Sequence, residues 1–536
     1  MDTPARQAAP PALTAAPGAT AATAATVAAG PTAADAGTTG VASGTASGTA
    51  SGAAHAAGMS SDPLYAQVAA HYRQAIAAGT MPPGSRMPSV RTLMGLHRVS
   101  LSTALQACRL LESQGLLQAR QRAGYFVRAP RPTRLARAAE PSQTQADPAR
   151  FVGVHERISD ILTRGIAAKA EINLSGACAH PSLYPTRALA LHGQRLLRRR
   201  PEILGTQPDP QGLLALRQAL SRLALNAQIQ IDPSQLVITH GCTEALSVAL
   251  RAVTTPGDAV AVESPTYYGL LQLLESLNLR ALEIPTSPHT GISVEALEAA
   301  AAREPRLKAV VVVPNLQNPL GAVMPDAAKQ ALLAACEARD LALIEDDTYA
   351  LLCDTPQRAI KSWDTTGRVI FCSSLHKTLA PGMRVGWIAA GRWQPRVEIL
   401  KYAQSRPNEM LGQAILAEFL AGGQIERHLR ALRARLATQR EQMVEALSDE
   451  LPVGTRLSLP PGGPSLWVEL PEGLSSLALF DAALEKGVRI GPGLMYSNSD
   501  RFDRFIRVNA GNPMDEAQRR GVAVLGELCA SMLRAR

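Results

Sequence analysis

One lysine in the second half of the chain is flanked by residues that suit covalent chemistry with a carbonyl group. Lys377 stands in the stretch Ser373–Trp387, which reads S-S-L-H-K-T-L-A-P-G-M-R-V-G-W. Apolar runs on both sides, Val369–Cys372 and Arg384–Ala389, predict two strands joined by a loop. A lysine in such a loop can form a Schiff base with an aldehyde, and Arg384 can clamp a phosphate through its planar guanidinium. The alternative is a solvated lysine in an ordinary loop, and residues elsewhere in the chain must distinguish the two.

Polar residues also follow other apolar runs, at the strand ends where ligands bind in open α/β sheets. Gly241, Cys242 and Thr243 open a helix after one run, so their N–H groups and the helix dipole suit a phosphate. Tyr267 follows a second run, where its ring can stack on a flat heterocycle. Asp346 ends a third run, and a carboxylate there can keep a pyridine nitrogen protonated, which makes the ring an electron sink.

Three more side chains complete this set of candidates. Asn318 and Tyr349 can donate hydrogen bonds to a phenolate oxygen of the same ring, and Arg507 can pair with the carboxylate of a substrate. Several of the candidates have an ordinary structural alternative: Asp346 as a helix cap, Tyr267 as a core residue and Asn318 as a turn residue. Because these residues occur in order along the chain together with Lys377, one shared binding site is favoured over a set of unrelated structural roles.

Length and composition bound the classes of protein that this chain can be. Its 536 residues suit roughly three to four domains, and 46% hydrophobic residues are enough for a large core. No apolar run is long enough to span a bilayer, and no basic region precedes an apolar one as in a secretory signal. The seven cysteines are scattered without C-x-x-C spacing, which suits a reducing cytoplasm and argues against a metal site.

The first part of the chain predicts a tail followed by a small basic domain. Residues 1–58 are almost entirely Ala, Thr, Gly, Ser and Pro, so they cannot bury enough apolar surface to fold and are expected to be disordered. Residues 61–128 carry a net charge of +6, which suggests a polyanionic partner such as nucleic acid. Three helices, of which Ser89 caps the second and Ser100 or Ser102 the third, precede a predicted hairpin, as in a winged helix-turn-helix. Helical spacing places in its core Leu64, Val68, Tyr72, Ile76, Leu105, Cys108, Leu110 and Leu111.

Four separated blocks in this segment carry a recognisable pattern: P-L-Y at 63–65, P-P-G-S-R-M-P-S-V-R at 82–91, V-S-L-S-T at 99–103 and L-E-S-Q-G-L at 111–116. They resemble the DNA-binding domain of the GntR family. By that resemblance the third helix enters the major groove of double-stranded DNA. The residues that the resemblance places on DNA are Arg91, Ser100, Ser102 and Thr103, with Arg120 and Arg122 on the wing.

The rest of the chain predicts a linker and a large α/β domain. Residues 129–150 are rich in Pro, Ala and Arg without a hydrophobic period, and we expect a semi-flexible linker. Residues 151–536 alternate apolar runs with helical stretches, which predicts a mostly parallel buried sheet. The expected strands are 236–239, 259–263, 281–284, 309–314, 341–345, 369–373 and 385–390. A smaller α+β subdomain is expected from about residue 425, with strands at 465–469, 488–490 and 505–508.

The candidate site residues resemble those of fold-type I aminotransferases, which bind pyridoxal 5'-phosphate, from about residue 170 to the C-terminus. The resemblance implies that Lys377 is the catalytic residue, which holds the cofactor and shuttles protons, that Asp346 pairs with the pyridine nitrogen, and that Tyr267 stacks. It assigns the phenolate to Asn318 and Tyr349, the substrate carboxylate to Arg507, and the phosphate to Arg384, Ser374, Gly241, Cys242 and Thr243. The stretch 204–212 departs from the family pattern. It lacks the tyrosine that, in the family, reaches the cofactor phosphate of the neighbouring subunit.

A GntR-like domain joined to an aminotransferase-like domain resembles the MocR-type transcription regulators. The resemblance implies a bacterial, cytoplasmic, homodimeric protein that associates with the nucleoid when it is bound to DNA, and no membrane or metal is expected. Its expected function is transcription regulation with pyridoxal 5'-phosphate as effector, alone or together with an amine or amino acid. Two alternatives stay open: an active transaminase with an accessory DNA-binding domain, and a regulator whose pocket is vestigial.

Overall fold

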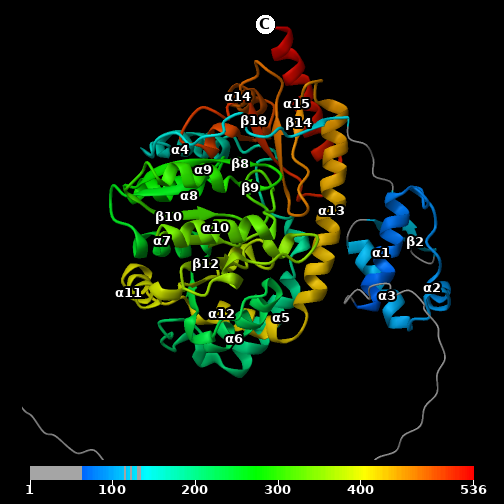
Figure 1. Ribbon diagram of the computed structural model, residues 1–536, viewed down its shortest axis with the longest axis horizontal. Helices are drawn as coiled ribbons and strands as arrows, with labels where there is room; N and C mark the ends of the chain where they lie inside the picture. Colours follow the sequence, from blue (N-terminus) through cyan, green and yellow to red (C-terminus); the bar gives the residue numbers. More distant parts are fainter. Residues whose placement is uncertain (1–62, 114–115, 121–122, 129–133, 536) are drawn as a thin grey trace, which may run out of the picture. The chain divides into compact units, whose positions relative to one another are not determined.

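The computed structural model describes residues 63–113, 116–120, 123–128 and 134–535 (Figure 1). They form a small N-terminal domain (residues 63–128) and a larger α/β body (residues 134–535), which are described separately. The tail expected to be disordered, residues 1–58, lies outside the described residues. Among the described helices, none is long and apolar enough to cross a bilayer.

The N-terminal domain is a three-helix unit followed by a β-hairpin, which confirms the predicted winged helix-turn-helix. Its elements are α1 (Leu64–Ala77), α2 (Val90–His97), α3 (Leu101–Ser113), β1 (Leu117–Arg120) and β2 (Gly124–Val127), with β1 antiparallel to β2. Ser89 caps α2, because its Oγ accepts a hydrogen bond of 3.1 Å from the N–H of Thr92. Ser100 caps α3 in the same way through the N–H of Thr103, also at 3.1 Å.

The core of this domain departs from the predicted faces in two places. Val68, Tyr72, Cys108 and Leu111 are buried as expected. Leu64 is 61% exposed, because it is the first residue of α1. In α3 the core takes Ala104 and Ala107, while Leu105 is only half-buried. A helix turns by about 100° per residue, so an error of one residue in phase changes which side chains face inward.

The body is built on one mixed sheet whose strand order is β4-β8-β7-β10-β11-β12-β13-β6, with β9 paired to β8. The strands β6, β7, β8, β10, β11 and β12 run in one direction, and β4, β9 and β13 run against them. The prediction of a mostly parallel sheet is therefore confirmed. The bounds are β4 Arg150–Phe151, β6 Val237–Thr239, β7 Ala259–Ser264, β8 Arg280–Ser287, β9 Gly291–Ile292, β10 Leu307–Val312, β11 Ala342–Asp346, β12 Val369–Ser374 and β13 Gly386–Ala389.

Helices cover this sheet and join it to a smaller C-terminal subdomain (Figure 1). Those of the first part of the body are α4 His155–Ala167, α5 Thr186–Arg199, α6 Leu214–Ala224, α7 Cys242–Val253, α8 Tyr268–Ser276, α9 Val294–Ala301, α10 Asp326–Ala338, α11 Gln394–Ser405 and α12 Met410–Ala421. The long helix α13 (Ile425–Glu450, orange) leads to the subdomain, which also contains α14 (Ser476–Glu485) and α15 (Glu516–Arg534). α7 packs on β11, β12 and β13, so its N-terminus is fixed beside the ends of these strands.

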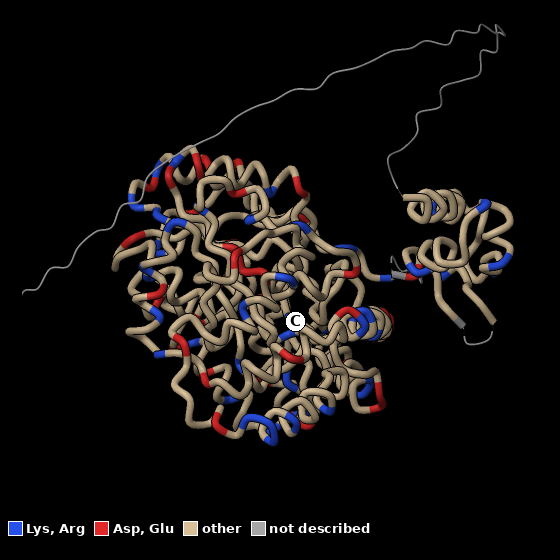
Figure 2. Tube along the Cα trace, turned by 90° about the horizontal axis from the view of Figure 1, so that it is seen from below, with Lys and Arg blue, Asp and Glu red and all other residues tan. Residues whose placement is uncertain are grey.

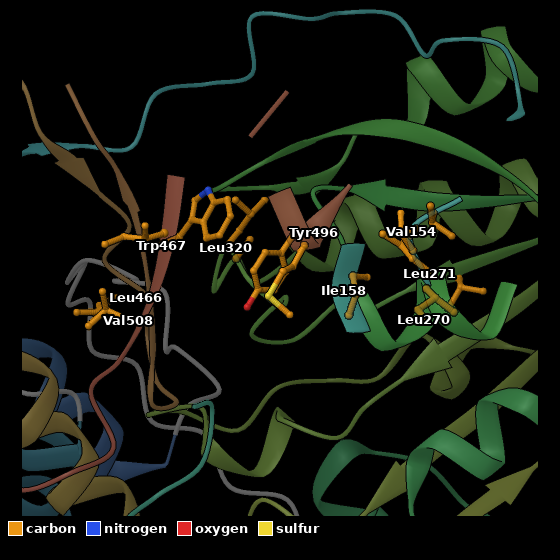
Figure 3. Packing of buried hydrophobic residues seen from close by; sticks show 14 of the residues in the cluster. Val154, Ile158, Leu270, Leu271, Leu320, Leu466, Trp467, Tyr496 and Val508 are labelled. Carbon is orange, nitrogen blue, oxygen red and sulfur yellow. The ribbon is translucent and has the colours of Figure 1, made fainter. Parts of the chain in front are cut away.

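The subdomain sheet has the order β17-β18-β15-β14-β3, and a two-stranded pair of β16 and β5 lies apart from it. The bounds are β3 Ala136–Arg137, β5 Ile172–Asn173, β14 Arg456–Leu457, β15 Ser465–Glu469, β16 Val488–Arg489, β17 Gly491–Pro492 and β18 Phe505–Asn509. Its core is continuous with that of the large sheet. In Figure 3, Tyr496 lies between Trp467 of β15 and Ile158 of α4, both of which are buried.

The segment expected to be a linker, residues 129–150, contains more structure than the sequence predicted. Its described part begins at residue 134, and it pairs with two different sheets. Ala136 and Arg137 form β3 beside β14 of the subdomain, whereas Arg150 begins β4 beside β8 of the large sheet. Between the two strands Asp147 forms an ion pair of 2.7 Å with Arg501. This part of the segment is therefore held on the body by backbone hydrogen bonds and charge.

A close backbone approach between β13 and the start of α7 generates the first prediction. A Cβ atom on Gly386 would lie 2.5 Å from the carbonyl carbon of Gly241 and 2.8 Å from the carbonyl oxygen of Ser373. These are backbone atoms that cannot move alone, so Gly386→Ala should lower the free energy of unfolding by about 1–3 kcal/mol in urea denaturation. Gly382→Ala is the matched control, because its Cβ would meet nothing within 4 Å. Equal stabilities of the two variants would contradict this packing.

Candidate functional site

The candidate site lies where the parallel strands of the body end. A cavity of about 360 Å³ opens there. It is lined by the sequence-predicted residues Cys242, Thr243, Tyr267, Asn318, Asp346, Tyr349, Ser374, Lys377, Arg384 and Arg507. Gly241 lies directly behind it, because a Cβ on that residue would be 2.8 Å from Nη2 of Arg384. The structure thus brings together all the residues that the sequence placed in one site of the body.

Lys377 lies just beyond β12, in the loop that leads to β13. Its side chain is half-buried, and its Nζ donates a hydrogen bond of 3.3 Å to Sγ of Cys178. The same nitrogen lies 5.3 Å from the centre of the Tyr349 ring. The lysine amine therefore lies inside the cavity, near a thiol and an aromatic ring.

Asp346 ends β11, and the two oxygens of its buried carboxylate differ in the hydrogen bonds that they accept. Its Oδ1 accepts hydrogen bonds from Oγ1 and N–H of Thr348, at 2.6 and 3.1 Å, and from Sγ of Cys242 at 3.2 Å. None of the described residues donates a hydrogen bond to Oδ2. Burial raises the pKa of this carboxyl above its ordinary value, because a buried charge lacks solvation. A cation placed at Oδ2 would offset that cost.

The N-terminus of α7 and the guanidinium of Arg384 form the anion-binding end of the site. Gly241 precedes α7 with φ of +82°, and no side chain caps the helix, so its first N–H groups face the cavity. Nη2 of Arg384 donates to the carbonyl oxygen of His240 at 3.3 Å, and its Nη1 lies 3.3 Å from Nδ1 of His376. Burial, with Lys377 and Arg384 nearby, lowers the pKa of His376 to about 4, so this imidazole is neutral at physiological pH.

Arg507 fixes the other end of the site. It is 5% exposed, and its Nη1 and Nη2 donate to Oδ1 of Asn318 at 3.1 Å and to the carbonyl oxygen of Ser175 at 2.6 Å. Its guanidinium lies 5.2 Å from the centre of the Tyr496 ring. Within the described residues its Nε has no hydrogen-bond partner. A buried cation with an unused donor suits a carboxylate ligand.

Two of the tyrosines that line the site, Tyr267 and Tyr349, are protonated at neutral pH. Burial raises the pKa values of Tyr267 and Tyr349 above their ordinary value, so both hydroxyl groups can donate hydrogen bonds at neutral pH. Tyr267 keeps its position because Gly269 has no side chain, and a Cβ there would lie 2.4 Å from Cζ of the tyrosine ring.

Several residues of the site were not singled out from the sequence. Thr348, two positions after Asp346, follows the spacing at which an Asp side chain bonds nearby polar groups, so it could have been found. Ser175, Cys178 and Tyr496 lie in segments without a motif, and only the fold brings them to the cavity. Their positions depend on long-range packing that no local pattern encodes.

The candidate DNA-contacting residues of the N-terminal domain lie on or beside its second and third helices. Arg91 is exposed on α2, and Ser100 and Ser102 are exposed at the start of α3. Oγ of Ser100 lies 2.8 Å from both Oγ of Ser102 and Oγ1 of Thr103. The charged residues of this domain are mostly Arg, drawn in blue in Figure 2. The side chain of Arg120, and the whole of Arg122, lie outside the described residues.

Comparison with known families identifies both parts of the chain. Residues 64–127 match the model described as bacterial regulatory proteins of the gntR family, and residues 185–524 match that of aminotransferase class I and II. The uncharacterized HTH-type transcriptional regulator YjiR of Escherichia coli K12 is 35% identical over 469 residues, which cover 86% of this chain and 98% of the relative.

This chain belongs to the MocR-type transcription regulators. The regulator therefore joins a GntR-type DNA-binding domain to an aminotransferase-like body. The body resembles two solved aminotransferases. The kynurenine aminotransferase of Pyrococcus horikoshii, in complex with PMP, has a TM-score of 0.66 and 28% identity, covering 70% of this chain and 95% of that one. LysN, an alpha-aminoadipate aminotransferase from Thermus thermophilus complexed with N-(5'-phosphopyridoxyl)-L-leucine, has a TM-score of 0.64 and 27% identity, covering 72% and 100%.

A buried glutamate beside the site generates a pH prediction. Glu263, near the end of β7, is 1% exposed, and its Oε2 accepts from the N–H of Val313 at 3.1 Å and from Nε2 of Gln317 at 3.2 Å. Burial raises the pKa of its carboxyl from 4.5 to about 8. In the unfolded chain the group ionises near 4.5, so its burial lowers stability progressively as the pH rises from about 4.5 to about 8.

Glu263→Gln should therefore match the wild type in free energy of unfolding below pH 4.5 and exceed it increasingly up to about pH 8, where the difference levels off. Urea denaturation over this pH range measures the difference. Glu485→Gln, at an exposed position of α14, is the control and should show no such trend. A difference for Glu263→Gln that is independent of pH would contradict the raised pKa.

Proposed function

We propose that this regulator binds pyridoxal 5'-phosphate in the body cavity, and that occupancy by the cofactor and an amine or amino acid sets its affinity for DNA. The observation that carries the proposal is the convergence of four features on one cavity. These are a half-buried lysine, a buried carboxylate with an unused oxygen, an uncapped helix N-terminus beside an arginine, and a second, buried arginine. The two solved relatives bound to phosphopyridoxyl or PMP ligands support the same assignment.

The residues of the cavity fit the parts of this cofactor. The N–H groups of Cys242 and Thr243, behind Gly241, would hold the phosphate together with Ser374 and Arg384. Asp346 would hold a proton on the pyridine nitrogen, and Tyr267 would stack on the ring. Lys377 would hold the aldehyde carbon, Asn318 and Tyr349 the phenolate oxygen, and Arg507 the carboxylate of an amino acid. When bound, the cofactor supplies an electrophilic carbon and a ring that accepts electrons.

A homodimer is part of the proposal. Large apolar side chains are exposed on neighbouring elements of the body: Leu191 on α5 is 43% exposed, Leu204 just after it 70%, and Leu214 on α6 50%. Both α5 and α6 pack on α12, so these side chains belong to one layer of the structure. Apolar surface of this kind is typical of a subunit interface. Two DNA-binding domains in one dimer suit an operator with two half-sites.

Ligand binding can control such a dimer only through a difference in affinity for two of its states. The site meets this requirement, because residues on its walls come from both the large sheet and the subdomain: Asp346 ends β11, whereas Arg507 lies in β18. A ligand that contacts both changes the free energy of any motion of the subdomain against the sheet.

Lys377→Ala tests the cofactor as a control element. The variant should still bind an operator obtained by binding-site selection, because the DNA-binding domain is unaltered, but it should lose most of its response to pyridoxal 5'-phosphate. DNA affinity and footprints are compared with and without the cofactor, and absorbance reports cofactor uptake. Lys308→Ala, at an exposed position of β10, is the matched control and should respond as the wild type does.

If the wild type takes up the cofactor but its operator binding, footprint and reporter output are all indifferent to it, the sensor function is wrong. Amino transfer between amino acids and keto acids, measured on the same preparation, would then identify an active transaminase.

Arg91→Ala tests the DNA-binding domain. Removal of one exposed guanidinium from α2 should weaken operator binding by about 1–3 kcal/mol and leave cofactor absorbance unchanged. The affinity of the wild type should fall steeply with salt, because bound arginines release counterions from the phosphates. Arg303→Ala, exposed on the body, is the control. Normal operator affinity of Arg91→Ala would show that Arg91 does not contact the operator.

A further inference from the structure

The cavity extends beyond the residues that the cofactor would occupy. Its remaining wall includes apolar side chains from several elements and one more cation, Arg489. The apolar members are Ile161 and Leu162 of α4, Leu246 of α7, Phe480 of α14, Ile490 and Met495. Apolar side chains together with one further guanidinium suit a ligand that has an apolar segment and an anionic group.

The strand pairing of the subdomain places Arg489 two residues before the partner of the buried Arg507. Arg489 lies in β16 and pairs in register with Asn173 of β5, which also lines the cavity. Two residues later, Gly491 pairs in register with Arg507 of β18. Arg489 and Gly491 both line the cavity.

The space around the Arg489 side chain is made by a glycine of α4. A Cβ on Gly165 would lie 2.7 Å from Nε and 3.1 Å from Cζ of Arg489. The absence of a side chain at this buried position lets the guanidinium lie against the helix backbone. Any larger residue at 165 would displace the guanidinium.

The guanidinium of Arg489 is half-buried, and it has no hydrogen bond or ion pair to any residue that the structure describes. Two acidic residues on the adjoining helices, Asp160 and Asp481, are already paired with another arginine. Arg164 of α4 forms ion pairs with Asp160, at 2.7 Å, and with Asp481 of α14. A partly buried cation without a partner is unfavourable, and an anionic ligand group would satisfy it.

We propose that Arg489 binds a second anionic group of the effector, so that this regulator responds to an acidic amino acid rather than to a neutral one. The proposal rests on the proposed function, in which Arg507 takes the α-carboxylate. The apolar wall then contacts the methylene groups between the two anionic ends, and the planar guanidinium of Arg489 receives the distal oxyanion in a bidentate manner. Carboxylate and sulfonate groups share this chemistry.

The test is a calorimetric titration of the purified full-length protein, loaded with pyridoxal 5'-phosphate as judged by absorbance. The probes are L-aspartate, L-glutamate and L-2-aminoadipate, each paired with a neutral analogue of similar size: L-asparagine, L-glutamine and L-norleucine. L-cysteate compares a sulfonate with the carboxylate of L-aspartate. In the wild type we expect at least one acidic probe to bind tenfold or more tightly than its neutral analogue.

Arg489→Gln should lose this preference by weakening the acidic probe about tenfold while the neutral analogue changes less than about twofold. Arg489→Lys should keep part of the preference, because the charge remains but the bidentate geometry is lost. Arg519→Gln, exposed on α15, is the matched control and should bind as the wild type does. Unchanged cofactor absorbance and unfolding temperature in all variants show that the effect is local.

The proposal is overturned if the wild type does not prefer any acidic probe, or if Arg489→Gln keeps the preference intact. Failure of the protein to take up the cofactor would instead overturn the proposed function. The same titrations are then run on the protein without cofactor, because Arg489 and Arg507 belong to the chain itself. Loss of the acidic preference in Arg489→Gln again supports the role of Arg489, and an intact preference overturns it.

Discussion

The burial of acidic side chains at the ends of β7 and β11 is the constraint on which the rest of the site depends. Glu263, Glu345, Asp346 and Asp347 are all buried, and burial raises the pKa of each. Such groups are tolerated only where donors surround them. The loop after β10 supplies several of these donors, from Val313, Asn315 and Gln317, and it also carries Asn318. Satisfying the buried acids therefore also positions the residues that face the cavity.

One network shows how far this requirement reaches. Nδ2 of Asn315 donates to Oδ1 of Asp347 at 2.9 Å, and the buried Nζ of Lys329 donates to Oδ1 of the same asparagine at 2.9 Å. The carboxylate of Glu345 accepts from the N–H groups of Ile360 and Lys361, both at 2.8 Å. The sheet edge is thus tied to α10 and to the segment before β12 by polar contacts, not only by apolar packing. Such a network makes the edge rigid, which a preformed ligand site requires.

The sequence predicted the parts of this structure that depend on local patterns. The strands β7, β11 and β12 were found because continuous apolar runs mark buried parallel strands, and the polar residues at their ends then had to meet at one edge. The strand β3, of two residues, could not be found, because a neighbouring strand that is distant in sequence creates it. Arg489 was missed for the same reason. The position of its guanidinium depends on the space left by Gly165 and on the pairing of β16 with β5. Neither contact produces a periodic pattern in the sequence.

The attachment of residues 134–151 has a mechanical consequence. This segment is fastened at one end to the subdomain, through β3 and β14, and at the other end to the large sheet, through β4 and β8. Any motion of the subdomain against the large sheet would therefore change the distance between the two attachment points of this segment. The chain that leads to the DNA-binding domain begins at the subdomain end of this segment. Because β3 is fixed on the subdomain, the start of that connecting chain would move with the subdomain and not with the large sheet.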